Sequence, residues 1–470
     1  MKAARRITIT AVATIGSALA LACACTCAHA TDLLAVYRLA QQSDPTIAAA
    51  KYTLESVRQK IPQARAGLLP AASATGSDGN TRADTEFTDV PPVDRNMKAW
   101  SWNLQLTQPI VRIGNIYAYK ESQYLVEQAE AQYAQAQQDL LLRVAQAYFG
   151  VTIAEDAIAA ADGQVAALEE QLAQVMRGYK LGTHALTDID DTKSRLGSAR
   201  AQRVSAQNDL ENARADLEKV TGQAFAEPTQ GNEHEHQHQG DGLSTSHLAV
   251  LQTTIAPPPP SPSDSRAWMD QARHNHPLVR AQRAALEAAR QEIKKNRSDH
   301  LPTIDLVANL GSNYASHSLT TPDDYSTRAT QHEAGIQLTV PIYSGGTIDS
   351  KVSEAIANMN KAEADLEAAS RQASTDAQQA YAGVTNGLAQ IDALNVAVES
   401  GQSAVKGNRV GYRLGIRINV DVLNAEQQLF TAQRDLSKAR YTTLLQGFKL
   451  KAAAGTLTEA DLVAVNAMLR

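Results

Sequence analysis

The stretch GNRVGYRLGIRINVDVLNAEQQ, residues 407–428, separates two long helical patterns that are rich in Ala and Gln. Its glycines interrupt the helical pattern, which resumes at Asp421. An earlier stretch, RGYKLGTHALTDIDDTKSRL at residues 177–196, has the same construction. The sequence therefore predicts two equivalent tips, each made of a helix, a tight turn and a returning helix.

The two tips belong to an internal duplication that spans nearly the whole chain. Landmarks of the first half recur in the second half at an offset of 232 residues as far as Pro109, and of 233 residues after it. The corresponding tip residues are Tyr179 and Tyr412, Gly182 and Gly415, and Asp188 and Asp421. Matches spread this widely predict two structural repeats, residues 31–225 and 265–470, joined by a linker at residues 226–264.

Residues 1–30 have the features of a secretory signal peptide. A basic start and a mostly apolar stretch precede Ala28-His29-Ala30, which supplies a cleavage site between small residues. All three cysteines lie in this segment, so the exported chain is expected to lack disulfides and thiolate metal sites. A lipid-anchored N-terminus at one of these cysteines, such as Cys23, is an open alternative.

Each half has the same order of expected elements. A first helix leads through Leu-Pro to two segments of alternating polarity, and two long helices follow. The expected ranges are helices 33–66, 117–180 and 187–221 with strands 71–77 and 100–107, then helices 265–298, 349–411 and 421–452 with strands 304–310 and 333–340. Alternation is clearest at residues 100–107 and 333–340 and weak at residues 71–77. Strict alternation predicts strands with one apolar and one polar face.

Four strands of roughly membrane-spanning length leave two unpaired edges. Lipid excludes such edges because nothing in the bilayer core satisfies the free amides and carbonyls. Spanning barrels begin at about eight strands, so several chains must share one barrel. Trp100 and Trp102 stand where interfacial aromatic residues are expected. The prediction is a mixed membrane protein, a homo-oligomer with a composite barrel above a long helical tube. A plain helical bundle is the alternative that the helices alone would allow.

The element order and two short runs resemble the TolC family of outer-membrane secretion and efflux channels. The runs are GIRINVDVL at residues 415–423 and AAAGTL at residues 452–457, and the resemblance covers nearly all of residues 31–465. It implies a homotrimer whose twelve-stranded β-barrel, with four strands per chain, continues into a long α-helical coiled-coil tunnel. It also implies an outer-membrane location with a large periplasmic portion and contact with outer-membrane lipid.

The same resemblance implies a gate at the tips. Thr187, Asp188, Tyr412 and Arg417 would form a polar network that closes the tunnel. Arg417 can hold a carboxylate through two hydrogen bonds, which makes Asp188 a suitable partner. The simpler role of Asp188 is that of an acid at a helix start, where the backbone dipole favours a negative charge.

An entrance constriction is implied at the start of the last long helix. Asp421 would form a ring of carboxylates that attracts cations, while Asn424 takes the place of a second acidic ring. Gly182 and Gly415 would contact the tips of a periplasmic adaptor. Their simpler role is to permit tight turns.

The linker contains His234-Glu235-His236-Gln237-His238, which matches the HExxH pattern of zinc proteases. That chemistry needs both zinc ligands on one helical face, and the neighbouring glycines argue against a helix there. Adventitious metal binding by His234, His236 and His238 is a weak alternative. No cofactor and no enzymatic activity are expected. The formal net charge of −6 disfavours nucleic acid as a partner.

The predicted function is an exit duct across the periplasm and outer membrane for secreted proteins (type I secretion), for drugs and toxic small molecules, or for both. An inner-membrane ABC or proton-driven transporter and its periplasmic adaptor would open it. One alternative is an outer-membrane factor dedicated to drug or metal efflux. Another, of a different class, is a periplasmic coiled-coil scaffold without a channel.

Overall fold

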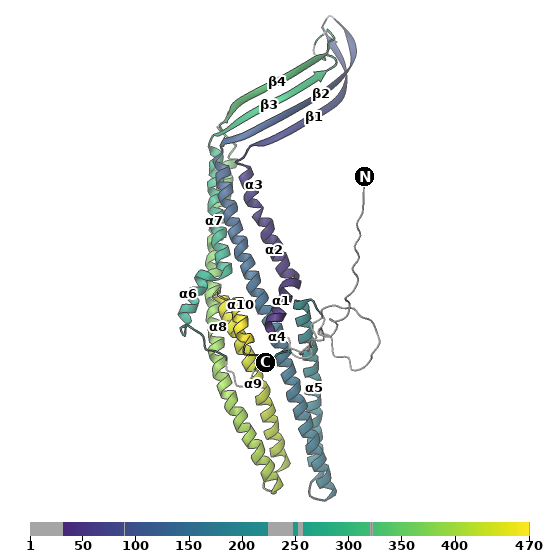
Figure 1. Ribbon diagram of the computed structural model, residues 1–470, viewed down its shortest axis with the longest axis vertical. Coiled ribbons are helices and arrows are strands. Elements are labelled where there is room, and N and C mark those ends of the chain that lie inside the picture. The colour runs from purple at the N-terminus through teal and green to yellow at the C-terminus, as the bar shows by residue number, and fades with distance from the viewer. Residues whose placement is uncertain are drawn as a thin grey trace, which may run out of the picture.

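The computed structural model describes residues 32–88, 90–223, 248–251, 257–319, 321 and 323–469. A tilted four-stranded sheet stands at one end of a long helical bundle, and two helical hairpins form the other end (Figure 1). The expected signal peptide, most of the expected linker and its HExxH histidines lie outside the described residues.

Both halves run from short helices through two strands to two long helices, which confirms the predicted internal duplication, and the second half adds α10. The first half contains α1 (Leu33–Ser43), α2 (Pro45–Arg58), α3 (Lys60–Ala66), β1 (Ala71–Phe87), β2 (Val90–Val111), α4 (Ile113–Lys180) and α5 (Leu186–Thr221). The second contains α6 (Ser265–Asn275), α7 (Pro277–Arg297), the 3-10 turn η1 (Ser298–His300), β3 (Thr303–Ala315), β4 (Thr327–Thr339), α8 (Thr347–Arg413), α9 (Asn419–Ala453) and α10 (Glu459–Asn466).

The prediction of one continuous helix before each pair of strands is wrong. Pro45 begins α2 and Pro277 begins α7, because proline has no amide proton and fits the first turn of a helix better than its interior. The preceding side chain caps each new helix. Asp44 accepts a hydrogen bond from the Thr46 amide at 2.7 Å, and His276 accepts one from the Leu278 amide at 3.2 Å.

The long helices agree with their predicted ranges to within four residues. α4 has 68 residues and α8 has 67, so each spans about 100 Å at about 1.5 Å per residue. α5 and α9 return along them and complete the two hairpins of Figure 1. Within the described part of the chain, no helix carries an apolar stretch long enough to cross a membrane.

The sheet has the antiparallel order β1-β2-β3-β4, which leaves β1 and β4 as edges of the described sheet. Leu104 lies opposite Ala74 on one side and Leu310 on the other, and Leu306 lies opposite Ile336. The strands extend beyond their predicted ranges, most clearly β2 with 22 residues. Its outer part was missed because alternation is lost before Trp100.

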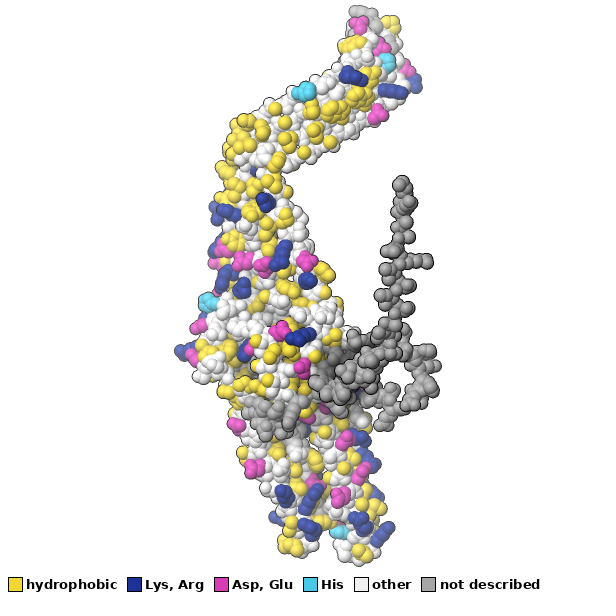
Figure 2. Space-filling view, in the orientation of Figure 1, with side chains coloured by type: hydrophobic (Ala, Val, Ile, Leu, Met, Phe, Trp, Pro, Cys, Tyr) yellow, Lys and Arg dark blue, Asp and Glu magenta, His cyan; other side chains and the backbone are white. Residues whose placement is uncertain are grey.

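The two faces of the sheet differ sharply in polarity. The register puts large apolar side chains on one face, among them Trp102, Leu104, Leu106, Leu306, Ile336 and Leu338, all of which are exposed in the single chain. The opposite face carries rows such as Ser73, Gln105, Asn309 and Glu333. Figure 2 shows apolar side chains over the sheet and charged ones mainly on the helices.

The largest core lies in the middle of the bundle, where the two halves meet. Phe149 of α4 packs against Tyr441 and Phe448 of α9, with ring centroids 5.6 and 6.4 Å apart. Residues 248–251 join this core, because the Tyr148 hydroxyl donates to the Ala249 carbonyl at 2.8 Å and the Leu251 amide donates to the Tyr441 hydroxyl at 3.1 Å.

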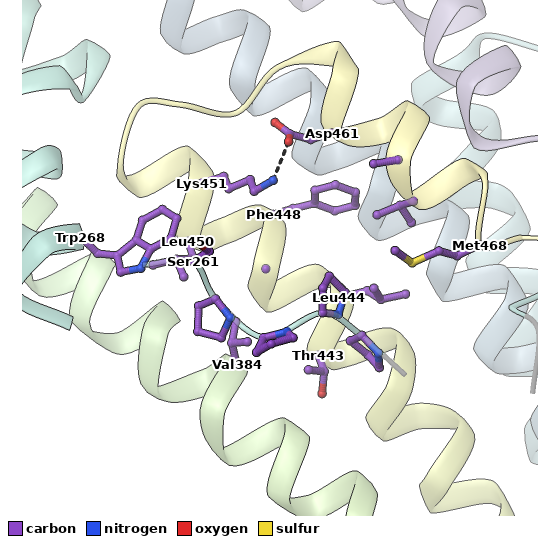
Figure 3. A pocket seen from close by; sticks show the side chains of 17 residues that line it. Ser261, Trp268, Val384, Thr443, Leu444, Phe448, Leu450, Lys451, Asp461 and Met468 are labelled. Atoms are coloured by element: carbon purple, nitrogen blue, oxygen red, sulfur yellow. Dashed lines mark hydrogen bonds and ion pairs between the residues drawn. The ribbon is translucent and has the colours of Figure 1, made fainter. Parts of the chain in front are cut away.

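An apolar cavity of about 300 Å³ lies beside this core, where residues 257–260 cross α9 and α10 (Figure 3). Trp268 lines it, and its indole nitrogen donates to the Pro262 carbonyl at 2.8 Å. Lys451 of α9 pairs with Asp461 of α10 at 2.6 Å, which fastens the last helix to the bundle. The two hairpins project from this middle part of the molecule (Figure 1).

Candidate gate at the helical tips

Both hairpins end in the same turn. Gly182 and Gly415 have φ values of +75° and +73°, a conformation that glycine adopts without steric cost. The Thr183 amide donates to the Gly178 carbonyl at 2.9 Å, and the Ile416 amide donates to the Gly411 carbonyl at 2.9 Å. The two glycines predicted at the tip turns therefore have the turn-forming role.

The residue after each turn folds back against a glycine of the preceding helix. A Cβ atom on Gly178 would lie 1.7 Å from His184 Cδ2, and one on Gly411 would lie 2.7 Å from Arg417 Cγ. His184 and Arg417 are separated by 233 residues, the offset of the duplication. Each tip therefore holds a cationic or protonatable side chain in a notch that only glycine leaves open.

Each of these side chains has an acid one helical turn further on. His184 Nδ1 lies 3.8 Å from Asp188 Oδ2, and Arg417 Nη1 lies 3.6 Å from Asp421 Oδ2. Asp188 also accepts a hydrogen bond from the Ala185 amide at 3.2 Å, as expected of an acid at a helix start. Within one chain Arg417 therefore pairs with Asp421, and the pair with Asp188 is not formed.

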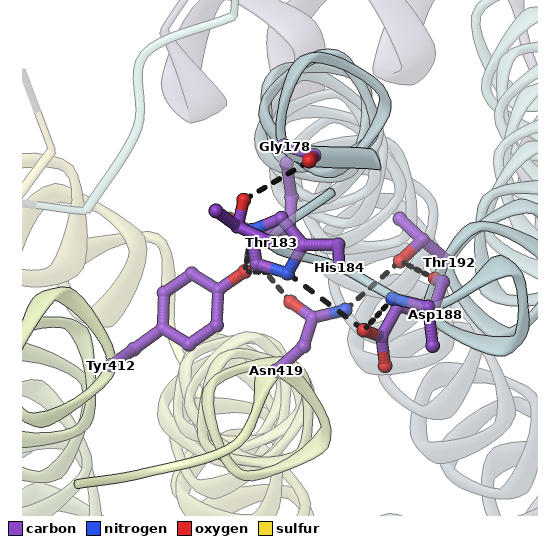
Figure 4. Close-up of polar contacts among 9 residues, drawn as sticks. Gly178, Thr183, His184, Asp188, Thr192, Tyr412 and Asn419 are labelled. Carbon is purple, nitrogen blue, oxygen red and sulfur yellow. Dashed lines mark hydrogen bonds and ion pairs between the residues drawn. The ribbon is translucent and has the colours of Figure 1, made fainter. Parts of the chain in front are cut away.

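Tyr412 of α8 reaches across to the other hairpin (Figure 4). Its hydroxyl lies 3.3 Å from His184 Nε2, and the two rings stack with centroids 5.8 Å apart. Burial raises the pKa of the Tyr412 hydroxyl, and the Asp188 carboxylate raises it further. Tyr412 therefore keeps its proton, and it donates to Nε2 when the imidazole proton is on Nδ1, toward Asp188.

Asn419, the first residue of α9, makes a second contact between the hairpins. Its side chain is buried, with 3% of the residue exposed. Its amide nitrogen donates to Thr192 Oγ1 of α5 at 3.1 Å, and its oxygen accepts a hydrogen bond from Gln171 of α4. An apolar cluster that includes Leu168, Leu196 and Leu423 backs these contacts.

The remaining predicted residues lie on the outside of the tips. Thr187 is exposed in the first turn of α5, and no hydrogen bond of its side chain occurs within the described ranges. The Asp421 side chain is 34% exposed. Asn424 is exposed, one turn along the same helix. Thr187 and Asn424 are thus outside the polar network of the single chain.

Sequence reasoning missed residues that join the hairpins, among them Gln171, His184, Thr192 and Asn419. His184 had a signal, since the 233-residue offset aligns it with Arg417. Gln171, Thr192 and Asn419 had no such signal in the sequence, because their contacts join residues more than 220 positions apart. No cluster of three or more His, Cys, Asp or Glu suited to a metal ion occurs among the residues that the structure describes.

Known proteins resemble this chain over most of its length. Residues 36–223 and 268–456 match the family described as "Outer membrane efflux protein". The alkaline protease secretion protein AprF of Pseudomonas aeruginosa is 31% identical, over 94% of this chain and 88% of that protein. The outer membrane protein TolC of Escherichia coli is 30% identical, over 93% of this chain and 85% of that protein. The solved structure of the outer-membrane channel OprN superposes with a TM-score of 0.73 at 17% identity, over 90% of both chains, which shows the fold.

Proposed function

Because this chain belongs to the outer membrane efflux protein family, we propose that its paired tips form the gate at the inner end of a channel. The protein is located in the outer membrane and has the channel-tunnel fold of that family. The sheet lies in the bilayer, and the helices extend into the periplasm.

The observation that carries the channel function is the sheet. It has one apolar face and one polar face, and it has two edges without a partner strand within the described sheet. Such a sheet is stable in lipid only as part of a closed barrel. Three chains supply the twelve strands of a composite barrel whose polar rows line the lumen. A coiled-coil scaffold without a channel would not need the exposed apolar face.

The gate opens when the α8–α9 hairpin separates from the α4–α5 hairpin. Within a chain, Arg195 of α5 donates to Gln427 of α9 at 3.2 Å and so resists this separation. Neutral contacts that also resist it are those of Tyr412 with His184 and of Asn419 with Thr192 and Gln171. Neutral hydrogen bonds of this kind contribute about 1 kcal/mol each. A latch of this strength holds the tips closed at rest and yields to a protein partner that binds them.

Asp421 controls which ions approach the entrance. Three copies around the tunnel axis make one ring of carboxylates, and the uncharged Asn424 supplies no second ring. Like charges near one axis attract cations and repel anions. Arg417 lies 3.6 Å from Asp421 within each chain, so it partly offsets this charge.

The partner that opens the gate docks on the tips. Leu181, Leu414 and Ile416 are 80%, 69% and 76% exposed at the turns. Exposed apolar side chains grouped at one place mark a surface for protein contact. The partner is a periplasmic adaptor, and an inner-membrane ABC or proton-driven transporter supplies the energy.

The first candidate cargo is a secreted protein, because the relative AprF is an alkaline protease secretion protein. Small toxic molecules are the second candidate, because the family description names efflux. Deleting the gene in its own host and restoring it on a plasmid distinguishes them. Loss of an extracellular protein with unchanged drug tolerance supports protein secretion, whereas the reverse result supports efflux. A deletion that alters neither would contradict both cargoes.

A further inference from the structure

A cluster of aromatic and basic residues lies on the apolar face of the sheet, toward the end farthest from the helices. Trp100, Tyr314 and Arg328 occupy one row across three strands. The two rings stack with centroids 6.0 Å apart, and Arg328 Cζ lies 5.8 Å from each centroid. The guanidinium therefore lies against an aromatic pair on the lipid side of the barrel wall.

Lys98 adds a second positive charge on the same face. It lies two residues before Trp100 in β2, opposite Asn80 of β1, and its side chain is exposed. Neither Lys98 nor Arg328 forms an ion pair with any residue that the structure describes. Further out, Arg82 is neutralised by its pair with Asp94. The acid closest in register is Asp78, opposite Trp100 on β1.

The depth of this cluster follows from the register. Ten residues of β3 separate the row of Tyr314 from the row of Ile304 and Leu338. At about 3.3 Å per residue and a strand tilt of about 40°, those rows lie about 25 Å apart along the membrane normal, which is the height of the apolar band of a barrel. Trp100 and Tyr314 therefore stand at one boundary of the apolar band.

That boundary faces the cell exterior. The helices leave the opposite end of the sheet and occupy the periplasm, so the free end of the sheet lies in the outer leaflet (Figure 1). Two strand spacings, about 10 Å, separate Arg328 from β2. The long Lys98 and Arg328 side chains can therefore both reach the head group of a single lipid.

We propose that Lys98 and Arg328 bind the phosphate groups of a phosphorylated glycolipid in the outer leaflet, with Trp100 and Tyr314 against its sugar and acyl boundary. A guanidinium matches phosphate through paired hydrogen bonds, and an ammonium binds it as a point charge. Aromatic side chains prefer the depth where head groups meet acyl chains. This site depends on the outer-membrane location and not on the proposed gate.

The test measures lipid bound to the purified full-length oligomer by native mass spectrometry, in detergent supplemented with bisphosphorylated lipid A. Zwitterionic phosphatidylethanolamine is the comparison lipid. Removing one positive charge near an anionic lipid weakens binding about fivefold. We therefore expect Lys98→Gln and Arg328→Gln each to weaken lipid A binding by that factor, and the double variant by about 25-fold. Phosphatidylethanolamine binding should stay unchanged.

The matched control is Arg82→Gln, which changes the net charge equally at the outer end of the same sheet but removes a paired cation. Equal weakening by this control would overturn the site in favour of general surface charge. Wild-type affinity in the double variant would also overturn it. Because β4 is an edge of the described sheet, a third result is possible. Dissociation of the Arg328→Gln oligomer, with normal lipid A binding to intact channels, would assign Arg328 to a subunit contact instead.

Discussion

His184 and Arg417 occupy the same position in the two halves of a duplicated chain, yet among the described residues His184 reaches the opposite hairpin as well as its own, while the ion pair of Arg417 lies within its own hairpin. His184 lies 3.3 Å from Tyr412 of the opposite hairpin, whereas Arg417 lies 3.6 Å from Asp421 of its own. The difference follows from packing, because the first tip presents its notch to α8 while the second leaves the Arg417 side chain 58% exposed. In the proposed gate, His184 fastens the hairpins of one chain, and Arg417 is accessible to a neighbouring chain.

Replacing Tyr412 with Phe should make the resting channel more open. The substitution keeps the ring stacking but removes the hydroxyl that meets His184, at a cost of about 1 kcal/mol. We expect higher single-channel conductance in planar bilayers. The control is Tyr179→Phe, the equivalent and 47% exposed position of the first half. Equal conductance in wild type and Tyr412→Phe would contradict the latch.

Gly178→Ala should break the same contact between Tyr412 and His184 by displacing His184. The added methyl group would lie 1.7 Å from His184 Cδ2, so the imidazole must leave its notch and its position beside Tyr412. Conductance should rise as in Tyr412→Phe, and combining the two changes should add little because both break one contact. Gly197→Ala is the control, since its new Cβ would meet nothing within 4 Å.

Asp421→Asn should weaken the preference of the channel for cations. The change removes one carboxylate per chain from the entrance and leaves Arg417 without its partner. The reversal potential in a potassium chloride gradient should therefore move toward zero. The shift should be largest at low salt, since the screening length is about 30 Å at 0.01 M and about 3 Å at 1 M. An unchanged reversal potential at low salt would argue that the ring lies elsewhere.

The Asp156 carboxyl lies at the joint between α4 and α9, where it accepts a hydrogen bond from Ser437. Burial raises the pKa of its carboxyl above the ordinary value, although a hydrogen bond from Ser437 acts in the opposite direction. A raised pKa in the folded protein means that the folded state binds the proton more tightly. This contribution to stability is present below about pH 4 and is lost as the pH rises through the folded pKa.

Asp156→Asn should therefore raise the melting temperature near neutral pH and remove part of the decline between acidic and neutral pH. Thermal unfolding monitored by circular dichroism over that range tests this. The exposed Asp209 of α5 provides the control variant Asp209→Asn, which should leave the pH profile unaltered. A profile for Asp156→Asn parallel to that of wild type would show that the carboxyl is not linked to unfolding.

Local sequence patterns determined the duplication, the order of elements, the long helices, the alternating strands and the turn glycines Gly182 and Gly415. Each of these follows from interactions within a few residues or from a repeated offset, so one sequence suffices to find it. The two wrong helix predictions, residues 33–66 and 265–298, ignored such a local rule, since Pro45 and Pro277 begin new helices. The extent of β2 was missed because its outer part lacks alternation.

Only the tertiary structure decided which tip residues meet. The deciding contacts join residues more than 220 positions apart: Asn419 with Thr192 and Gln171, and Tyr412 with His184. Whether two such side chains touch depends on how two long helices rotate and slide against each other, which the central core of Phe149, Tyr441 and Phe448 fixes. The helical periodicity of a sequence shows which face of a helix is apolar. It does not fix how two helices are aligned, and a shift of one residue between them changes every polar contact that joins them.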